Sequence, residues 1–173
     1  MDELIDDVLF LSELETGREV VSLGSTEAAP IVREIASEVE ESAERAGLRL
    51  RVHIEDEALE LPIRARMLRV VLENLVLNAI RYAGEGATAV VFLGRENDAA
   101  VLAVKDDGAG VRDDDLPRLF ERFYRGDRAR TTRGSGLGLA IVKHVVEAAG
   151  GRVEARGAPA AGLEIRCVFP ERA

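Results

Sequence analysis

The sequence predicts an α+β fold, a two-layer α/β sandwich in which about three helices cover one face of a mixed, mostly antiparallel sheet. Segments with helical spacing of apolar residues are mixed with segments that alternate like strands. The two kinds do not alternate regularly along the chain, which disfavours a doubly wound parallel sheet. With 173 residues, of which 47% are hydrophobic, the chain can bury one sizeable core.

Composition excludes several classes of protein. The formal net charge of −9 argues against a nucleic-acid-binding surface. No apolar run approaches the roughly 18 residues of a membrane span, and the N-terminus is no signal peptide. The single cysteine, Cys167, excludes an internal disulfide and a thiolate zinc cluster. We therefore expect a soluble, cytoplasmic protein.

Residues 1–17 read as an amphipathic helix that ends at Gly17. Its apolar seam consists of Leu4, Val8, Leu11 and Leu14. The spacing is that of a bundle or coiled-coil helix, which needs a packing partner because a lone helix of this length is marginal in water. The seam can pack on another helix or on its own domain, and the sequence leaves both open.

The next stretch combines strands with one long helix. A weak alternation predicts a strand over 18–23, and Ser25 or Thr26 can cap a helix from about Glu27 to Ala46. The alternation of LRLRVHI predicts a half-buried strand over Leu48–Ile54, and a brief strand is expected at Leu59–Leu61.

A second long helix is predicted from about Ile63 to Ala83. Its buried stripe consists of Leu68, Val71, Leu72, Leu75, Val76 and Ala79. The rest of the chain predicts two adjacent strands, a short helix in a glycine-rich charged region, a glycine-led helix and two final strands. These are Ala87–Leu93, Ala99–Lys105, Asp115–Arg122, the helix within Arg133–Gly151, Arg152–Ala155 and Leu163–Phe169.

The stretch Arg133–Gly151 carries chemistry because three alternating glycines, Gly134, Gly136 and Gly138, open an amphipathic helix. Such a loop exposes free backbone N–H groups at the positive end of the helix dipole, which suits phosphate. The alternative is a hinge ahead of an ordinary core helix.

Asn74 and Asn78 lie one turn apart on the long helix, where Asn is a poor residue. A carboxamide oxygen is a hard, neutral ligand for Mg²⁺, and Arg81 would add charge for phosphate oxygens. The alternative is that both amides are solvated or bonded to a loop.

Two further segments are less specific. In Val104–Val111 a strand ends in DxGxG, where glycines admit a ligand close to the backbone and a carboxylate can accept from an exocyclic amine. In Leu119–Arg125, aromatic side chains could pin a loop while Arg122 and Arg125 face a γ-phosphate. A plain turn and ordinary core aromatics would look similar.

The four segments in this order resemble the catalytic ATP-binding domain of sensor histidine kinases, whose wider superfamily includes gyrase, a heat-shock chaperone and mismatch-repair ATPases. They are similar to its N box (Asn74–Tyr82), G1 box (Asp106–Gly110), F box (Phe120–Phe123) and G2 box (Gly134–Gly138). The resemblance covers roughly residues 18–170 and implies the Bergerat ATP-binding fold. Residues 1–17 look like the end of a dimerisation and histidine-phosphotransfer helix, which makes 18–173 the catalytic domain.

The resemblance also implies roles for individual residues. Asn78 coordinates Mg²⁺, Asn74 supports the phosphate site, and Arg125 reaches the γ-phosphate of ATP across a lid of about Val111–Arg133. Arg81 contacts phosphate and Tyr82 flanks the adenine. The remaining residues shape the adenine pocket or admit the phosphates: Asp106 (reading adenine N6), Gly108, Gly110, Phe120, Gly134, Ser135, Gly136, Leu137 and Gly138.

Two positions depart from the family pattern, because Arg81 stands where Lys is frequent and Asp107 where Asn is frequent. The acceptor histidine of the family, which an acid follows, has no match: His53 lies in a predicted strand, and His144 is followed by Val145. We therefore expect Mg²⁺–ATP binding and γ-phosphoryl donation to a histidine on the phosphotransfer domain of a dimeric parent kinase that serves a response regulator. The sequence leaves open whether that parent kinase is anchored in a membrane. The alternatives are an anti-sigma-type serine kinase and a degenerate binding module.

Overall fold

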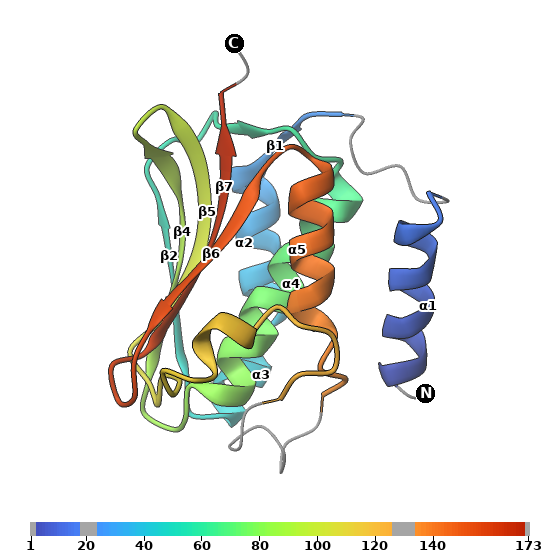
Figure 1. The fold of residues 1–173 in the computed structure, drawn as a ribbon. Helices are drawn as coiled ribbons and strands as arrows, with labels where there is room; N and C mark the ends of the chain where they lie inside the picture. The colour runs from blue at the N-terminus through green and yellow to red at the C-terminus, as the bar shows by residue number, and fades with distance from the viewer. Residues whose placement is uncertain (1–2, 18–23, 126–133, 172–173) are drawn as a thin grey trace.

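A computed structural model describes residues 3–17, 24–125 and 134–171. Among these residues, one five-stranded sheet has the order β2-β4-β5-β7-β6, and only β2 and β4 run parallel (Figure 1). Its strands are β2 (Arg49–Ile54), β4 (Thr88–Glu96), β5 (Ala99–Asp106), β6 (Arg152–Gly157) and β7 (Leu163–Pro170). The predicted mixed, mostly antiparallel sheet is confirmed.

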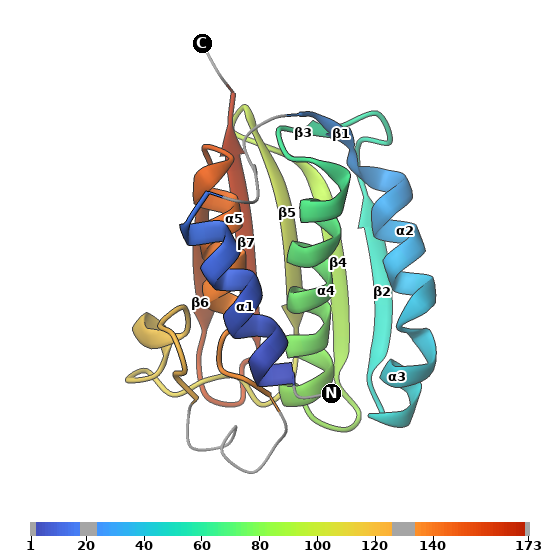
Figure 2. The ribbon, with the colours of Figure 1, turned by 90° about the vertical axis from the view of Figure 1, so that its right-hand side faces the viewer.

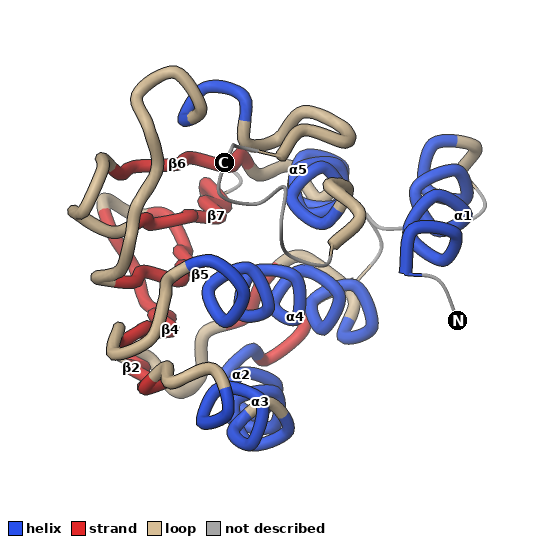
Figure 3. Tube along the Cα trace, turned by 90° about the horizontal axis from the view of Figure 1, so that it is seen from below, coloured by secondary structure: helices blue, strands red, loops and turns tan. Residues whose placement is uncertain are grey.

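Three helices cover one face of this sheet, side by side (Figures 1 and 3). They are α2 (Ala28–Glu38), α4 (Ala65–Tyr82) and α5 (Gly138–Ala148). The stripe predicted for α4 is buried throughout, with Met67 added to it. This apolar face packs against the inner face of the sheet and forms the core of the sandwich. The predicted two-layer α+β architecture is therefore correct.

The helix predicted from Glu27 to Ala46 is wrong in detail, because Val39 divides it into α2 and α3 (Glu40–Arg45). No proline or glycine marks the division in the sequence. Ile35 on α2 and Ala43 on α3 are both buried, so both pieces pack on the core.

The predicted cap of this helix is also wrong. Glu27 is the N-cap residue and makes no side-chain cap, while the hydroxyl of Thr26 donates to the carbonyl of Ile63 at 2.6 Å. Thr26 instead belongs to β1 (Thr26–Glu27), which pairs with β3 (Glu60–Leu61). Towards the C-terminus, the short helix expected at Asp115–Arg122 is only the 3₁₀ turn η1 (Leu116–Arg118). The strand predicted at 18–23 falls outside the described residues.

Helix α1 (Glu3–Glu15) lies outside the sandwich, on the side of α5 that faces away from the sheet (Figures 1 and 2). Leu11 and Leu14 are buried, and α1 contacts α5. Four other apolar side chains stay exposed: Leu4, Ile5, Val8 and Leu9. Part of the predicted seam therefore packs on its own domain, and the rest of it, Leu4 and Val8, is exposed.

Within the described part of the chain, no helix combines the length and the apolar character that a membrane crossing requires.

Candidate functional site

A pocket lies where the C-terminal half of α4, the loop after β5 and the segment before α5 meet. Most of the residues that the sequence singled out line it, although they come from four separate stretches of chain. They are Asn74, Asn78, Arg81, Tyr82, Asp106, Gly110, Arg125, Gly134, Ser135, Gly136 and Gly138.

On α4, the polar line runs along the edge of the buried stripe and faces the pocket. The side-chain amide of Asn74 donates to the carbonyl of Val70 at 2.8 Å, so its oxygen is left facing away from that carbonyl. Asn78 lies one turn further on and lines the same wall. The side-chain amides of Asn74 and Asn78, the first of them held in orientation, thus line the pocket together with Arg81.

Asp106, the last residue of β5, also lines the pocket. Only 6% of the residue is exposed. Burial raises the pKa of its carboxyl group, and backbone N–H donation from Gly108 (2.9 Å) and Leu163 partly offsets this. A buried carboxylate that faces a pocket is a strong acceptor for a ligand N–H.

The loop after Asp106 approaches other backbone too closely for larger residues. A Cβ atom at Gly110, where φ is +69°, would overlap the carbonyl oxygen of Ala158. A Cβ atom at Gly108 would overlap the carbonyl oxygen of Ala83, at the end of α4. Gly108 therefore lets the loop dock on α4 and does not itself line the pocket.

The structure assigns a role to Asp107, which the sequence left unexplained. Its carboxylate accepts the backbone N–H of Thr88 at 2.7 Å, and its own N–H donates to the carbonyl of Thr88 at 3.1 Å. Asp107 therefore ties the start of this loop to the start of β4, outside the pocket.

The aromatic and arginine segment is divided between core and pocket. Phe120 is partly buried against the core and does not line the pocket, whereas Phe123 is 57% exposed. Arg125 and Tyr124 do line it. Arg122, expected to face a γ-phosphate, instead pairs with Glu15 of α1.

The glycine-led segment closes the pocket at the N-terminus of α5. The backbone N–H of Phe123 donates to the carbonyl of Gly136 at 2.8 Å, so this segment holds the aromatic one. The hydroxyl of Ser135 accepts the N–H of Leu137 at 3.0 Å. Leu137 is buried below the pocket and supports it without lining it. Arg133 and the rest of 126–133, in the predicted lid, fall outside the described residues.

Sequence reasoning missed the contribution of α1. Glu3 lines the pocket and pairs with Arg81 at 2.9 Å, and Asp7 accepts a hydrogen bond from the hydroxyl of Ser135. It also missed apolar and polar wall residues, for which no sequence signal exists because they look like ordinary core or loop positions. These are Leu77, Ala109, Val111, Arg112, Asp115, Leu119, Tyr124, Leu139, Pro159 and Leu163.

Comparison with known proteins gives a consistent result. The family described as "Histidine kinase-, DNA gyrase B-, and HSP90-like ATPase" matches residues 63–173. The sensor protein SphS of Synechococcus elongatus is 37% identical over 171 residues, which cover 94% of this chain and 41% of SphS. This chain thus spans about two fifths of the length of that relative.

Two solved structures are similar in fold. Full-length ShkA in complex with AMPPNP has a TM-score of 0.82 at 27% identity, over 96% of this chain and 35% of ShkA. The histidine kinase ThkA in complex with the response regulator TrrA has a TM-score of 0.74 at 20% identity, over 96% of this chain and 47% of that one. The second likeness concerns the fold alone.

Proposed function

Since this chain belongs to the histidine kinase-, DNA gyrase B- and HSP90-like ATPases, as the ATP-binding catalytic domain of a two-component sensor histidine kinase, we propose that it binds Mg²⁺–ATP and donates the γ-phosphoryl group to a histidine outside its own pocket. One observation carries the proposal. The buried carboxylate of Asp106 lines the same pocket as two amides, two arginines and the N-terminus of α5.

The Asp106 end suits adenine. Its buried carboxylate accepts from the exocyclic amine N6, and Tyr82 offers a ring for the base. Apolar side chains from several elements also line the pocket: Val111, Leu119, Leu139 and Leu163. A buried acceptor of this kind discriminates against purines that lack the amine, because its lone pair would then be unpaired.

The other end suits phosphates. Arg81 and Arg125 supply positive charge, and the segment Gly134–Gly138 lets phosphate oxygens approach the N-terminus of α5. The amide of Asn78 lines the pocket beside Arg81 and fits a magnesium ion that takes its other ligands from water and phosphate oxygens. Bound Mg²⁺ supplies neutralisation of charge on the β- and γ-phosphates. Asn74 holds the neighbouring wall in place, so this chain contributes positioning and electrostatics.

Neither histidine of this chain is placed to accept the phosphoryl group. The side chain of His53 is 59% exposed on β2, where it stacks on Phe92 with ring centroids 5.8 Å apart. His144 lies on α5, and neither residue lines the pocket. We infer that the acceptor lies on the dimerisation and phosphotransfer domain of a longer, dimeric protein. In that protein, residues 1–17 end the phosphotransfer helix and 18–173 form the catalytic domain.

The partner that receives the phosphoryl group in this proposal is a response regulator, as membership of the sensor histidine kinases implies. We place the ATP-binding step in the cytoplasm, where ATP is available.

Calorimetric titration with Mg²⁺–ATP tests the binding step. We expect Asp106→Asn to weaken binding at least tenfold, which corresponds to about 1.4 kcal/mol. Asp107→Asn is the matched control: it makes the same chemical change one residue away, outside the pocket, and should bind like the wild type. Equal affinity of the wild type and Asp106→Asn would refute the proposed pocket.

Incubation with γ-labelled ATP tests the transfer step. The chain alone should acquire no acid-labile phosphate, and label should appear on a phosphotransfer domain of the family that is added to it. Stoichiometric acid-labile label on this chain itself would contradict an acceptor outside it.

A further inference from the structure

Three acidic side chains of helix α1 contact residues that line the nucleotide pocket or lie in the segment that precedes it. Glu3 pairs with Arg81 on α4 at 2.9 Å, with its carboxylate inside the pocket wall. Asp7 accepts a hydrogen bond from the hydroxyl of Ser135, and Glu15 pairs with Arg122. These contacts join residues up to 128 positions apart in the sequence.

The acids belong to the face by which α1 docks. Glu3, Asp7, Leu11 and Glu15 follow one another at four-residue spacing, which places them along one stripe of a helix. Leu11 is buried within that stripe, and the neighbouring Leu14 is buried too. Figure 2 shows α1 lying across α5, with its first turn beside the end of α4. The apolar contacts of Leu11 and Leu14 therefore hold α1 on the domain. This docking places Glu3 and Asp7 beside the residues proposed to bind phosphate.

A carboxylate and a phosphate seek the same hydrogen-bond donors. The guanidinium of Arg81 is held by Glu3, and the hydroxyl of Ser135 is held by Asp7. Both donors belong to the region that the proposed function assigns to the phosphates of ATP. The two carboxylates would also repel the negative charge of a nucleotide triphosphate across a short distance.

We propose that docked α1 is a competitive inhibitor built into the chain, in which Glu3 and Asp7 take the donors that ATP phosphates require. The proposal rests on the function proposed above. Binding of Mg²⁺–ATP and docking of α1 then oppose each other, and the coupling is reciprocal: nucleotide loosens α1, and a shift of α1 opens the pocket. A movement of this helix in a longer protein would thereby control access of ATP.

Nucleotide titration of the full chain tests the competition. We expect Glu3→Gln/Asp7→Asn to bind Mg²⁺–ATP roughly tenfold more tightly than the wild type, a typical size for such a coupling. The control is Asp6→Asn/Glu13→Gln, which removes the same charge from exposed positions of the same helix. It should bind within about twofold of the wild type.

Adenosine separates competition for phosphate donors from a general opening of the pocket. Because adenosine has no phosphate, its affinity should be equal in the wild type and in Glu3→Gln/Asp7→Asn. An equal gain for adenosine and ATP, or no gain for ATP, would overturn this inference and leave the proposed function standing. If neither the wild type nor the variants bind ATP or adenosine, the proposed function falls and takes the inference with it.

Hydrogen exchange of the wild type gives a second readout that needs no variant. Saturating Mg²⁺–ATP should reduce the protection of the backbone amides of α1, and adenosine should leave it unchanged. Unchanged or greater protection of α1 with Mg²⁺–ATP would contradict reciprocal coupling.

Discussion

A Cβ atom at Gly138, the first residue of α5, would lie 2.8 Å from the side-chain oxygen of Asn74 on α4. That oxygen is not free to turn, because the amide nitrogen of Asn74 donates to the carbonyl of Val70 at 2.8 Å. The two helices that carry the phosphate end of the pocket therefore meet at a point where only glycine fits without displacing the amide.

The variant Gly138→Ala should weaken the binding of Mg²⁺–ATP while leaving the free energy of unfolding almost unchanged. Alanine favours the helix over glycine by about 1 kcal/mol, and disturbing the Asn74 hydrogen bond costs about the same. The free energy of unfolding should therefore change little. The affinity for Mg²⁺–ATP should fall roughly tenfold, or about 1.4 kcal/mol, because the wall beside Asn78 moves. Calorimetry and thermal unfolding measure the two effects.

Gly134→Ala is the control for this variant. Its Cβ atom would meet only the tips of long side chains, the hydroxyl of Tyr82 at 3.1 Å and a guanidinium nitrogen of Arg81 at 3.4 Å. It should weaken binding less than Gly138→Ala does. The reverse order would show that the contact with Asn74 is unimportant.

Gly110→Ala should be strongly destabilising. The backbone there has φ of +69°, and the added Cβ atom would overlap the carbonyl oxygen of Ala158. Gly86→Ala is the control that measures the cost of the positive φ alone, because φ is +87° there and nothing lies within 4 Å of its Cβ position. We expect Gly86→Ala to cost about 1–2 kcal/mol of unfolding free energy and Gly110→Ala more than about 3 kcal/mol. Urea unfolding that gives equal costs would contradict the overlap.

The elements that the sequence predicted correctly are those with long, regular patterns. The stripe of α4 and the hairpin of β4 and β5 each repeat their period several times, so local pattern and tertiary environment agree. The division of the second helix at Val39 and the absence of a Thr26 cap could not be predicted. The hydroxyl of Thr26 donates to the carbonyl of Ile63, which is distant in the sequence, and no glycine or proline marks the division at Val39.

In the functional site, too, only residues with a local sequence signal could be predicted. Asn78, Asp106 and the glycines could be singled out because their residue types are unusual for their positions or occur in a motif. The contacts of Glu3 with Arg81 and of Asp7 with Ser135 had no such signal, because acids on an exposed helix face are ordinary. Only the docking of α1 through Leu11 and Leu14 determines what those acids meet.

Cys167 should be chemically inert in the native protein. The residue is fully buried on β7, and burial raises the pKa of its thiol from 9.0 to about 12. The thiolate is the reactive form, so a thiol-specific reagent at pH 8 should modify native protein at least about 100-fold more slowly than urea-unfolded protein. Absorbance of the released chromophore measures the rate. Rapid stoichiometric labelling without unfolding would contradict the burial.

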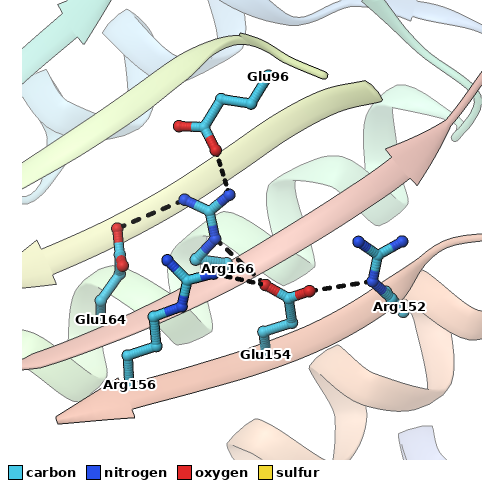
Figure 4. Close-up of polar contacts among 6 residues, drawn as sticks. All are labelled: Glu96, Arg152, Glu154, Arg156, Glu164 and Arg166. Atoms are coloured by element: carbon cyan, nitrogen blue, oxygen red, sulfur yellow. Dashed lines mark hydrogen bonds and ion pairs between the residues drawn. The ribbon is translucent and has the colours of Figure 1, made fainter. Parts of the chain in front are cut away.

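The outer face of the sheet, opposite the helices, carries a charged cluster centred on Arg166 (Figure 4). Its side chain is 9% exposed and contacts Glu154 at 3.3 Å, Glu164 at 3.7 Å and Glu96. Beside it lie the buried apolar side chains of Val168 on the same strand and of Val101 and Ala103 on the neighbouring β5. Three carboxylates therefore share this one buried arginine as a partner, and Glu154 pairs with Arg152 and Arg156 as well.

Replacing Arg166 by alanine should lower the unfolding free energy by about 3 kcal/mol, because it leaves these carboxylates without their common partner. Arg156→Ala is the matched control. That side chain is 64% exposed and contacts the same Glu154 at 3.5 Å, so its loss should cost at most about 1 kcal/mol. Urea unfolding at pH 7 measures both. Equal losses would show that burial of Arg166 adds nothing.

The contribution of Glu154 should depend on pH. Its pKa is lowered, first by the hydrogen bond from Arg152 and then by Arg166. A carboxyl group with a lowered pKa in the folded state stabilises the fold above its unfolded pKa of about 4.3. That stabilisation is lost as the pH falls through the folded value. Glu154→Gln should therefore be less stable than the wild type by about 1 kcal/mol at pH 7, and the difference should vanish in acid.

Glu41→Gln is the control. It removes an exposed partner of Arg45 and should differ little from the wild type at any pH. A pH-independent deficit for Glu154→Gln would show that its packing, and not its charge, stabilises the sheet.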